Sequence, residues 1–254
     1  MLYFLEQFTI LLAFTFIGNG LGYLFYYWFL SRYNSSFNEL TYERKLYNVK
    51  NITKATFLAY LTIYTSPNIY TLIRTGVWNN DLITWMGHIY VSTDIAGLFF
   101  VRELPKLTRI HHSIVFFLGT MSILADYGKP GIHRNLVALT YFSIIPYSVN
   151  CLLGTKDLQF HPEFYRWLAV WSSFIYGICI ACNFIYQHIS IFFYNNDWWP
   201  IRFGYLAIYH LIFLDDRNLM MWLYKVARNP QFSKPLSVEE ESISEVCLSE
   251  NSSI

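Results

Sequence analysis

The segment "WLAVWSSFIYGICIACNFIYQHISIFFYNN", residues 167–196, decides what class of protein this sequence encodes. It runs for 30 residues without an aspartate, a glutamate, a lysine or an arginine. A helix needs roughly 20 apolar residues to cross about 30 Å of hydrocarbon, so this segment is long enough to span a bilayer. The whole chain agrees, because 54% of its residues are hydrophobic and only 14% are charged, whereas soluble domains carry about 25% charged residues.

Six further segments predict additional membrane-spanning helices. Three are free of charge or nearly so, and three are interrupted by polar residues. A charge at mid-bilayer costs at least roughly 2.5 kcal/mol, so such interruptions often mark a functional site. The first group comprises 2–30, 55–73 and 135–154, and the second 82–101, 105–125 and 200–224. We therefore expect an all-α, polytopic membrane protein with about seven transmembrane helices.

The basic residues are distributed unevenly between the alternate loops of such a chain. Thirteen lysines and arginines, Lys50 and Lys54 among them, fall on the side of the first predicted loop and the C-terminal tail, against four on the other side. Cytoplasmic loops carry the excess of basic residues. We expect a lumenal N-terminus and a cytoplasmic C-terminus, with the endoplasmic reticulum as the membrane.

The chain divides by composition into three parts. Residues 1–39 hold the first span and the start of a loop, and residues 40–228 form a six-helix membrane domain. Residues 229–254 are rich in serine and glutamate, with too few large apolar residues to build a core. Such a composition predicts a disordered, acidic cytoplasmic tail.

Two adjacent histidines, His111 and His112, lie in "LPKLTRIHHSIVFFLG", residues 104–119. A helix that begins at Pro105 places them about 9 to 10 Å along its axis, at the cytoplasmic boundary between headgroups and acyl chains. Adjacent helical residues point in different directions, so one ring can contact a ligand while the other faces a neighbouring helix. The pair is a candidate catalytic base or acyl acceptor. A role as interfacial residues without a ligand stays open.

Asp94 is an acid inside the preceding span, and Tyr90 lies one turn earlier on the same face. A carboxylate in the bilayer must be paired, be protonated or face water. Because a short loop joins the two spans, Asp94 can reach a histidine of the pair and orient its imidazole. The alternative is a buried hydrogen bond that only fixes helix packing. His88 is a further polar candidate in this span.

The last span, "HLIFLDDRNLMMWLYK", gathers polar residues near its cytoplasmic end. We expect Arg217 to neutralise one of two neighbouring carboxylates, which leaves the other for a partner or a proton. A purely structural ion pair is the alternative. The candidates for a lipid-binding or structural polar core in this span are His210, Asp215, Asp216, Arg217, Asn218 and Trp222.

Basic residues surround the start of the helix that carries the histidine pair. The positive end of a helix dipole attracts anions. We therefore expect a lipid phosphate or the phosphates of an acyl-CoA to bind the loop formed by Arg102, Lys106 and Arg109.

Other site classes have little in the sequence to support them. Cys179 and Cys182 form "CIAC" without a second cysteine pair, so we expect no metal site. The chain has no glycine-rich phosphate loop and no basic helix suited to nucleic acid, so we expect neither a nucleotide cofactor nor a nucleic-acid partner. A di-iron oxidase needs several histidine boxes, and this chain has one adjacent pair. A transporter or receptor stays possible.

The order of these motifs resembles the TLC-domain family, which includes ceramide synthases and small lipid-regulating membrane proteins. Tyr-x-x-x-Asp, at Tyr90 and Asp94, is followed by His-His on the next span, as in the family core. The ending with Asn218, Trp222 and Lys225 resembles the family's closing segment. The resemblance implies a TLC-like helical barrel over about 40–228.

Three departures from the family pattern bear on mechanism. The span at 135–154 contains no aspartate or glutamate, although the family has an acid there. "NITKAT", residues 51–56, stands where the family has a Ser-x-x-His sequence, and the ceramide-synthase signature is absent from residues 113–131. The chain is thus more similar to the small TLC-domain proteins than to the synthases.

Two functions follow from the resemblance. The first is membrane lipid homeostasis, in which the polar core binds or regulates lipids, with membrane lipids as partners. The alternative is an acyltransferase that moves an acyl group from acyl-CoA, as co-substrate, to a sphingoid base. In that enzyme His111 or His112 acts as base or acyl acceptor, and Asp94 orients the imidazole.

Overall fold

The computed structural model describes residues 2–102 and 104–228, and within them every regular element is a helix. The expectation of an all-α protein is confirmed for this part of the chain, whereas the predicted tail at 229–254 lies outside it. The elements are α1 (Leu2–Ala13), η1 (Phe14–Gly18), α2 (Asn19–Tyr33), α3 (Ser35–Glu39), α4 (Tyr42–Thr75), α5 (Asn80–Phe100), α6 (Lys106–Ser122), α7 (Ile132–Ile144), α8 (Tyr147–Thr155), α9 (Pro162–Ile189), η2 (Ser190–Tyr194) and α10 (Trp199–Arg228).

Two helices are long and apolar enough to cross a membrane by length and composition. They are Leu2–Tyr33 and Pro162–Tyr194, with mean hydropathy 1.7 and 1.8. Only 22% of the most apolar window of the first helix is buried, so most of that surface faces outward. Helices α7 and α8 pass the same test as a pair bent by 46°. The bend follows from Pro146, which has no N–H to continue the hydrogen-bond ladder.

The other predicted spans are helical but too polar or too short for this test. Helices α4, α5, α6 and α10 each overlap a predicted segment. Their tyrosines, threonines and charged residues lower the hydropathy, and α6 has only 17 residues. By this criterion the described residues hold two or three spans rather than seven.

The connections between the helices gather at two ends of the bundle. At one end, the Asn80 amide donates to Asp126 over 3.1 Å, and the backbone N–H of Ile132 donates to Asp197 over 2.6 Å. These bonds tie together the turns before α5, before α7 and before α10. At the other end, the Asn34 amide donates to the carbonyl of Leu158 over 3.3 Å, which joins the α2–α3 turn to the α8–α9 connection.

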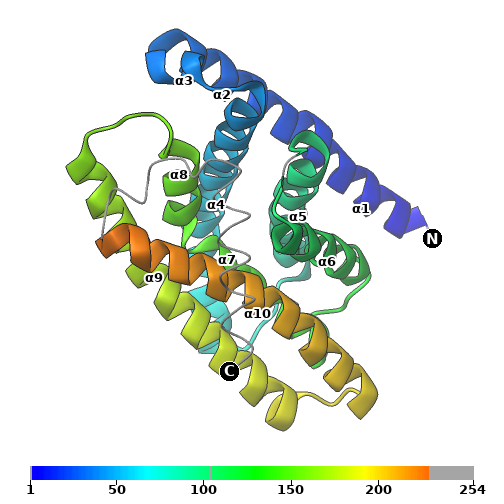
Figure 1. Cartoon of the computed structure of the whole chain (residues 1–254). Coiled ribbons are helices and arrows are strands. Elements are labelled where there is room, and N and C mark those ends of the chain that lie inside the picture. Colours follow the sequence, from blue (N-terminus) through cyan, green and yellow to red (C-terminus); the bar gives the residue numbers. More distant parts are fainter. Residues whose placement is uncertain (1, 103, 229–254) are drawn as a thin grey trace.

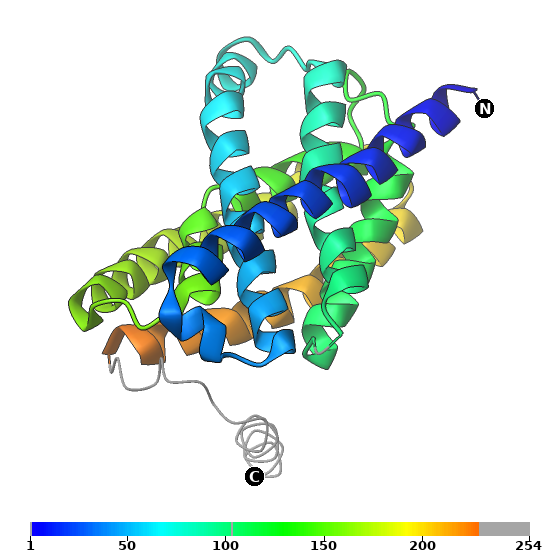
Figure 2. The ribbon, with the colours of Figure 1, turned by 90° about the horizontal axis from the view of Figure 1, so that it is seen from above.

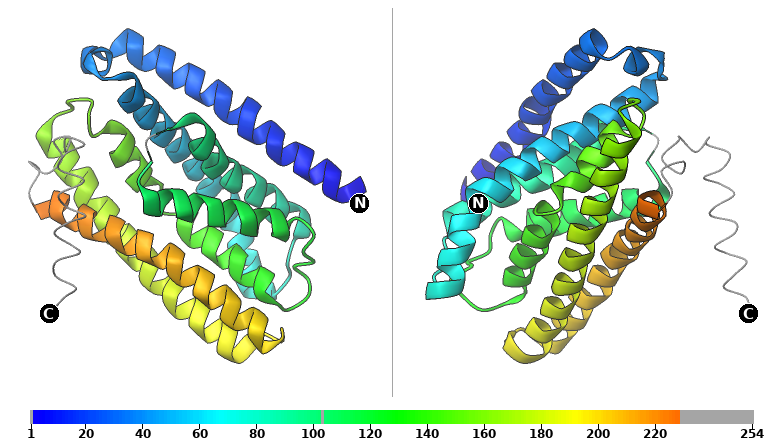
Figure 3. Two further views of the ribbon diagram at one scale, coloured as in Figure 1. Left: turned by 45° about the vertical axis from the view of Figure 1, so that its right-hand side comes forward. Right: turned by 90° about the vertical axis from the view of Figure 1, so that its left-hand side faces the viewer.

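The helices lie in three groups. The continuous helix α1–α2 runs along one side, the antiparallel pair α9 and α10 runs along the opposite side, and α4 to α8 fill the space between (Figures 1 and 3). Figure 2 shows α4 and α5 as a hairpin whose turn lies near the α6–α7 connection. The N-terminal part of α1 packs at this same end, where Phe4 and Phe8 contact a cluster that includes Tyr127.

Two helix boundaries differ from the prediction. Helix α6 begins at Lys106, and Pro105 is its N-cap rather than its first residue. Helix α4 begins at Tyr42, thirteen residues before the predicted span at 55–73. Lys50 and Lys54 are therefore helical and largely buried, with side chains inside the bundle. The interpretation of these two lysines as loop cations was wrong.

Gly154 is a point of close approach between α8 and α4. A Cβ at this position would lie 2.8 Å from the backbone nitrogen of Ile52 and 3.0 Å from the carbonyl oxygen of Asn48. Because backbone atoms cannot move aside as a flexible side chain can, the helices must separate to admit a methyl group. Gly204 on α10 has no atom within 4 Å of the same position.

We expect Gly154→Ala to destabilise the protein by about 1–3 kcal/mol, the usual cost of overpacking. The midpoint of thermal unfolding in detergent measures the loss. Gly204→Ala is the matched control, and it should leave the midpoint unchanged or raise it slightly. Equal midpoints for the two variants would contradict the close α4–α8 contact.

Candidate functional site

Three helices bring one buried ion pair and one histidine together. Asp94 on α5 has no exposed surface, and the ammonium group of Lys54 on α4 donates a hydrogen bond to its Oδ1. Nδ1 of His112 on α6 lies 2.8 Å from the same oxygen. The contact between a histidine of the pair and Asp94, expected from the short α5–α6 turn, is confirmed for His112.

Three polar atoms of this group are buried without a hydrogen-bond partner in residues 2–102 and 104–228, namely Asp94 Oδ2 and both ring nitrogens of His112. His112 Nδ1 is close to Asp94 Oδ1 but is not aligned for a hydrogen bond, and Nε2 has no such neighbour. A buried polar atom without a partner costs roughly 1–3 kcal/mol. The group therefore has one acceptor and one imidazole nitrogen to offer to a ligand or to a proton.

His111 makes a second, more open pair with α10. Its Nδ1 lies 2.9 Å from Asp215 Oδ2, and Thr108 donates to Asp215 Oδ1 over 3.2 Å. A carboxylate only accepts hydrogen bonds, so Nδ1 carries a proton and donates it to Asp215, and in the neutral ring Nε2 keeps a lone pair. The side chains of His111 and Asp215 are 15% and 18% exposed, so this pair is accessible in a way that the Asp94 pair is not.

The two histidine rings connect the pairs. Their centroids are 5.6 Å apart, with an angle of 58° between the planes. His112 faces α5 while His111 faces α10, as the rotation between adjacent helical residues predicts. Tyr176 on α9 donates to Asp216 Oδ1 over 2.8 Å. The site thus contains residues from α4, α5, α6, α9 and α10.

Arg217 does not neutralise either neighbouring carboxylate. Its side chain is exposed, and it forms no ion pair within the described part of the chain. Asp215 is held by His111 and Thr108 instead, and Asp216 by Tyr176. Arg217 lies one residue further along α10, on the outward face. The expectation of an Arg217 ion pair was wrong for the residues that the structure describes.

Lys50 is a buried cation without a carboxylate beside it. It is 4% exposed, and its Nζ lies 5.7 Å from the centroid of the Tyr47 ring. Lys156, after α8, lies 5.1 Å from the same ring and 5.9 Å from Trp222. Tyr90 is buried with the Lys54 ammonium 5.9 Å from its ring centroid.

The remaining predicted residues do not join this site. His88 is buried on α5 and lines a small cavity with Leu11 and Tyr127. His210 is exposed and bonds only its own helix, through Leu206 O. Asn218 is exposed as well. The basic loop residues Arg102, Lys106 and Arg109 are all exposed around the α5–α6 turn.

Sequence reasoning missed Lys54 and Tyr176. Lys54 was counted as a loop residue because the start of α4 was placed too late, and a helix from Tyr42 would have put it within reach of Asp94. No sequence pattern indicated a role for Tyr176, since a tyrosine in an apolar span is usually a packing residue. Among the described residues no group of three or more histidines, cysteines or acids is arranged to hold a metal ion.

A second buried polar network shows what a satisfied cluster looks like in this fold. Asn135 donates to Gln187 Oε1 over 2.9 Å, and Gln187 donates to Asn135 O and to Asn183 Oδ1, each over 3.0 Å. Ser190 and Tyr205 complete it. Its bonds hold α7, α9 and α10 together. The open atoms of Asp94 and His112 stand in contrast to this network.

The Lys54–Asp94 pair generates a stability prediction. Asp94→Ala leaves a buried ammonium group without its partner, so we expect a loss of about 3–5 kcal/mol. The double variant Lys54→Met with Asp94→Leu removes both charges and should recover most of that loss. Unfolding in detergent measures both variants, and Lys129→Met, which breaks an exposed pair with Asp126, should behave as wild type. Purely additive losses in the double variant would refute the pair's role.

Comparison with known proteins adds no identification: no protein-family model, no curated protein and no solved structure matches this chain.

Proposed function

We propose that this chain is a TLC-type membrane protein with about seven spans that acts in membrane lipid homeostasis by binding a lipid at its two His–Asp pairs. The observation that carries the proposal is the pair of contacts His111–Asp215 and His112–Asp94 inside an apolar bundle. Titratable groups inside a membrane protein are costly, and they usually mark a site for a ligand, an ion or a proton.

The gathering of connections at two ends supports the seven-span topology. Residues of the turns before α5, before α7 and before α10 bond one another at one end, together with the N-terminal part of α1. The opposite end carries the greater share of basic residues, even after Lys50 and Lys54 are removed from the loop count. That end is cytoplasmic by the positive-inside rule, and the endoplasmic reticulum remains our proposed membrane.

The open atoms of the site indicate what kind of lipid group it takes. His111 offers Nε2 at a partly exposed position, and Asp94 and His112 offer buried atoms behind it. Lys50 provides a buried positive charge close by, without a carboxylate of its own. A lipid with a carbonyl, hydroxyl or anionic group satisfies these atoms, while its acyl chain lies along the apolar helices.

One observation favours acyl transfer as a second candidate function. Asp215 accepts from Nδ1–H of His111, so in the neutral ring Nε2 holds the lone pair. Such a nitrogen can take a proton from a long-chain amine as the amine attacks the thioester carbonyl of acyl-CoA. The imidazolium then returns that proton to the departing thiolate, which gives an amide and free CoA. In this candidate function Asp215 of α10 takes the role of the acid that the family has in its fifth span.

The lipid proposal predicts that site variants change membrane lipid composition. Comparative lipidomics of cells expressing wild type, His111→Ala or Asp215→Asn at equal abundance should show the same lipid class altered in both variants. His210→Ala is the matched control, because His210 is an exposed histidine on the same helix as Asp215, and it should behave as wild type. Site variants that match wild type in every lipid class would leave the cluster with a structural role only.

The acyl-transfer candidate predicts a catalytic step that depends on His111. Purified protein with a panel of acyl-CoAs and sphingoid bases should form amide product, and His111→Ala should lower the rate by about 10²–10⁴-fold, as for loss of a general base. The product is measured by mass spectrometry. Absence of any amide from folded wild-type protein would exclude this candidate while leaving the lipid-binding proposal intact.

A further inference from the structure

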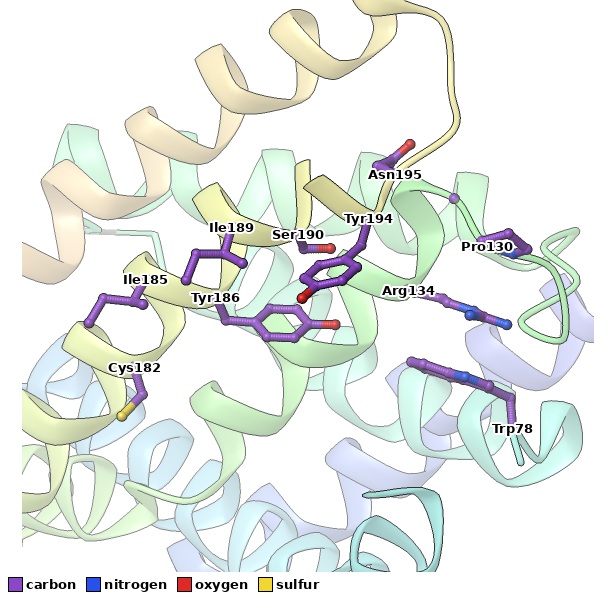
Figure 4. A pocket seen from close by; sticks show the side chains of 11 residues that line it. Trp78, Pro130, Arg134, Cys182, Ile185, Tyr186, Ile189, Ser190, Tyr194 and Asn195 are labelled. Carbon is purple, nitrogen blue, oxygen red and sulfur yellow. The ribbon is translucent and has the colours of Figure 1, made fainter. Parts of the chain in front are cut away.

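A cavity lies at the other end of the bundle from the His–Asp pairs. It has a volume of about 400 Å³, within the range of small-molecule sites. It lies between α9, the turn after α4 and the α6–α7 connection, as Figure 4 shows. None of the proposed His–Asp residues lines it. Its lining includes Trp78, Arg134, Cys182, Ile185, Tyr186 and Asn195.

One wall of this pocket is apolar and faces outward. Ile185 is 57% exposed on α9, and Cys182 lies one turn before it on the same side. Tyr186 projects from α9 toward the side chains of Trp78 and Arg134 (Figure 4). Tryptophan and tyrosine are enriched where a membrane meets water. The wall therefore suits an acyl chain, and the aromatic end suits the headgroup level.

Arg134 puts a positive charge at that end without pairing it to an acid. Its Nε and Nη2 donate to the carbonyls of Tyr127 and Gly128 over 2.9 and 2.6 Å, and its guanidinium carbon is 4.6 Å from the Trp78 ring centroid. No carboxylate of the described residues forms an ion pair with it. The acids nearby are engaged elsewhere, since Asp126 accepts from Asn80. Nη1 makes no hydrogen bond within residues 2–102 and 104–228.

Asn195 also borders the pocket. It is 4% exposed, and its Nδ2 has no partner within the described segments. Its Oδ1 accepts from the backbone N–H of Asp197 over 2.8 Å, and Figure 4 shows its side chain pointing away from Arg134. Arg134 is therefore the group that favours a ligand with acceptor oxygens at the aromatic end of the pocket.

We propose that this pocket binds one glycerophospholipid, with the phosphate at Arg134 and an acyl chain along Cys182 and Ile185. A guanidinium group matches phosphate oxygens in geometry and charge, and an aromatic ring beneath it holds it in place. The acyl chain covers the exposed apolar wall. This second lipid site goes beyond the His–Asp site and does not depend on its chemistry.

Arg202 provides a matched control within the same end of the bundle. Its guanidinium carbon is 4.5 Å from the Trp199 ring centroid, and it donates to the carbonyls of Asp197 and Ile191 over 2.6 and 3.2 Å. It therefore repeats the structural contacts of Arg134. It does not line the pocket. A lipid phosphate in the pocket therefore contacts Arg134 and not Arg202.

The test is native mass spectrometry of the full chain in detergent, titrated with phosphatidylglycerol or with diacylglycerol of the same acyl chains. We expect phosphatidylglycerol to bind wild type and Arg202→Gln alike, and Arg134→Gln to lose about tenfold or more in affinity. Equal binding to Arg134→Gln, or equal binding of diacylglycerol, overturns the proposal. Displacement of the lipid by inorganic phosphate at comparable concentration shows a free anion site and overturns it too.

A second measurement needs no change at Arg134. In a variant that keeps only Cys182, with Cys151, Cys179 and Cys247 replaced by serine, the rate of alkylation by a maleimide reports whether the apolar wall is covered. Phosphatidylglycerol should slow alkylation several-fold, and diacylglycerol should slow it less. Equal alkylation rates with both lipids would mean that the phosphate does not anchor the chain, and the proposal would fall.

Discussion

The cost of placing a charge in an apolar interior governs this structure. The carboxylate of Asp94 has no exposed surface, so it can remain charged only if a cation reaches it. Lys54 supplies that cation from α4, and His112 approaches the same oxygen from α6. The requirement fixes how α4, α5 and α6 face one another. The second pair, His111 with Asp215, then sets where α10 crosses α6.

This constraint separates two kinds of polar cluster within one bundle. The amide network around Gln187 satisfies its own donors and acceptors, and its effect is to fasten three helices. The His–Asp cluster leaves Asp94 Oδ2 and His112 Nε2 unsatisfied within the described residues. A role in helix packing is enough to explain the amide network. It does not explain the His–Asp cluster, because apolar side chains of the same shape in place of the charged ones would stabilise the fold without the desolvation cost.

The sequence allowed the helical class, the helix positions and part of the site to be predicted. Apolar runs identify helices, and a short turn after Asp94 predicts its contact with one histidine. Lys54 was missed because propensity alone does not show that α4 starts before the apolar run. The partner of Asp215 was also missed, since the contact joins helices about a hundred residues apart in sequence. Such contacts depend on how helices cross, and no local pattern encodes that.

The amide network differs from the His–Asp contacts in its response to acid. Asparagine, glutamine, serine and tyrosine side chains keep their charge state across the physiological range, so the hydrogen bonds of this network are indifferent to proton concentration. The His–Asp contacts join α6 to α5 and to α10 instead. A change of protonation at those contacts therefore leaves the hydrogen bonds of the amide network in place.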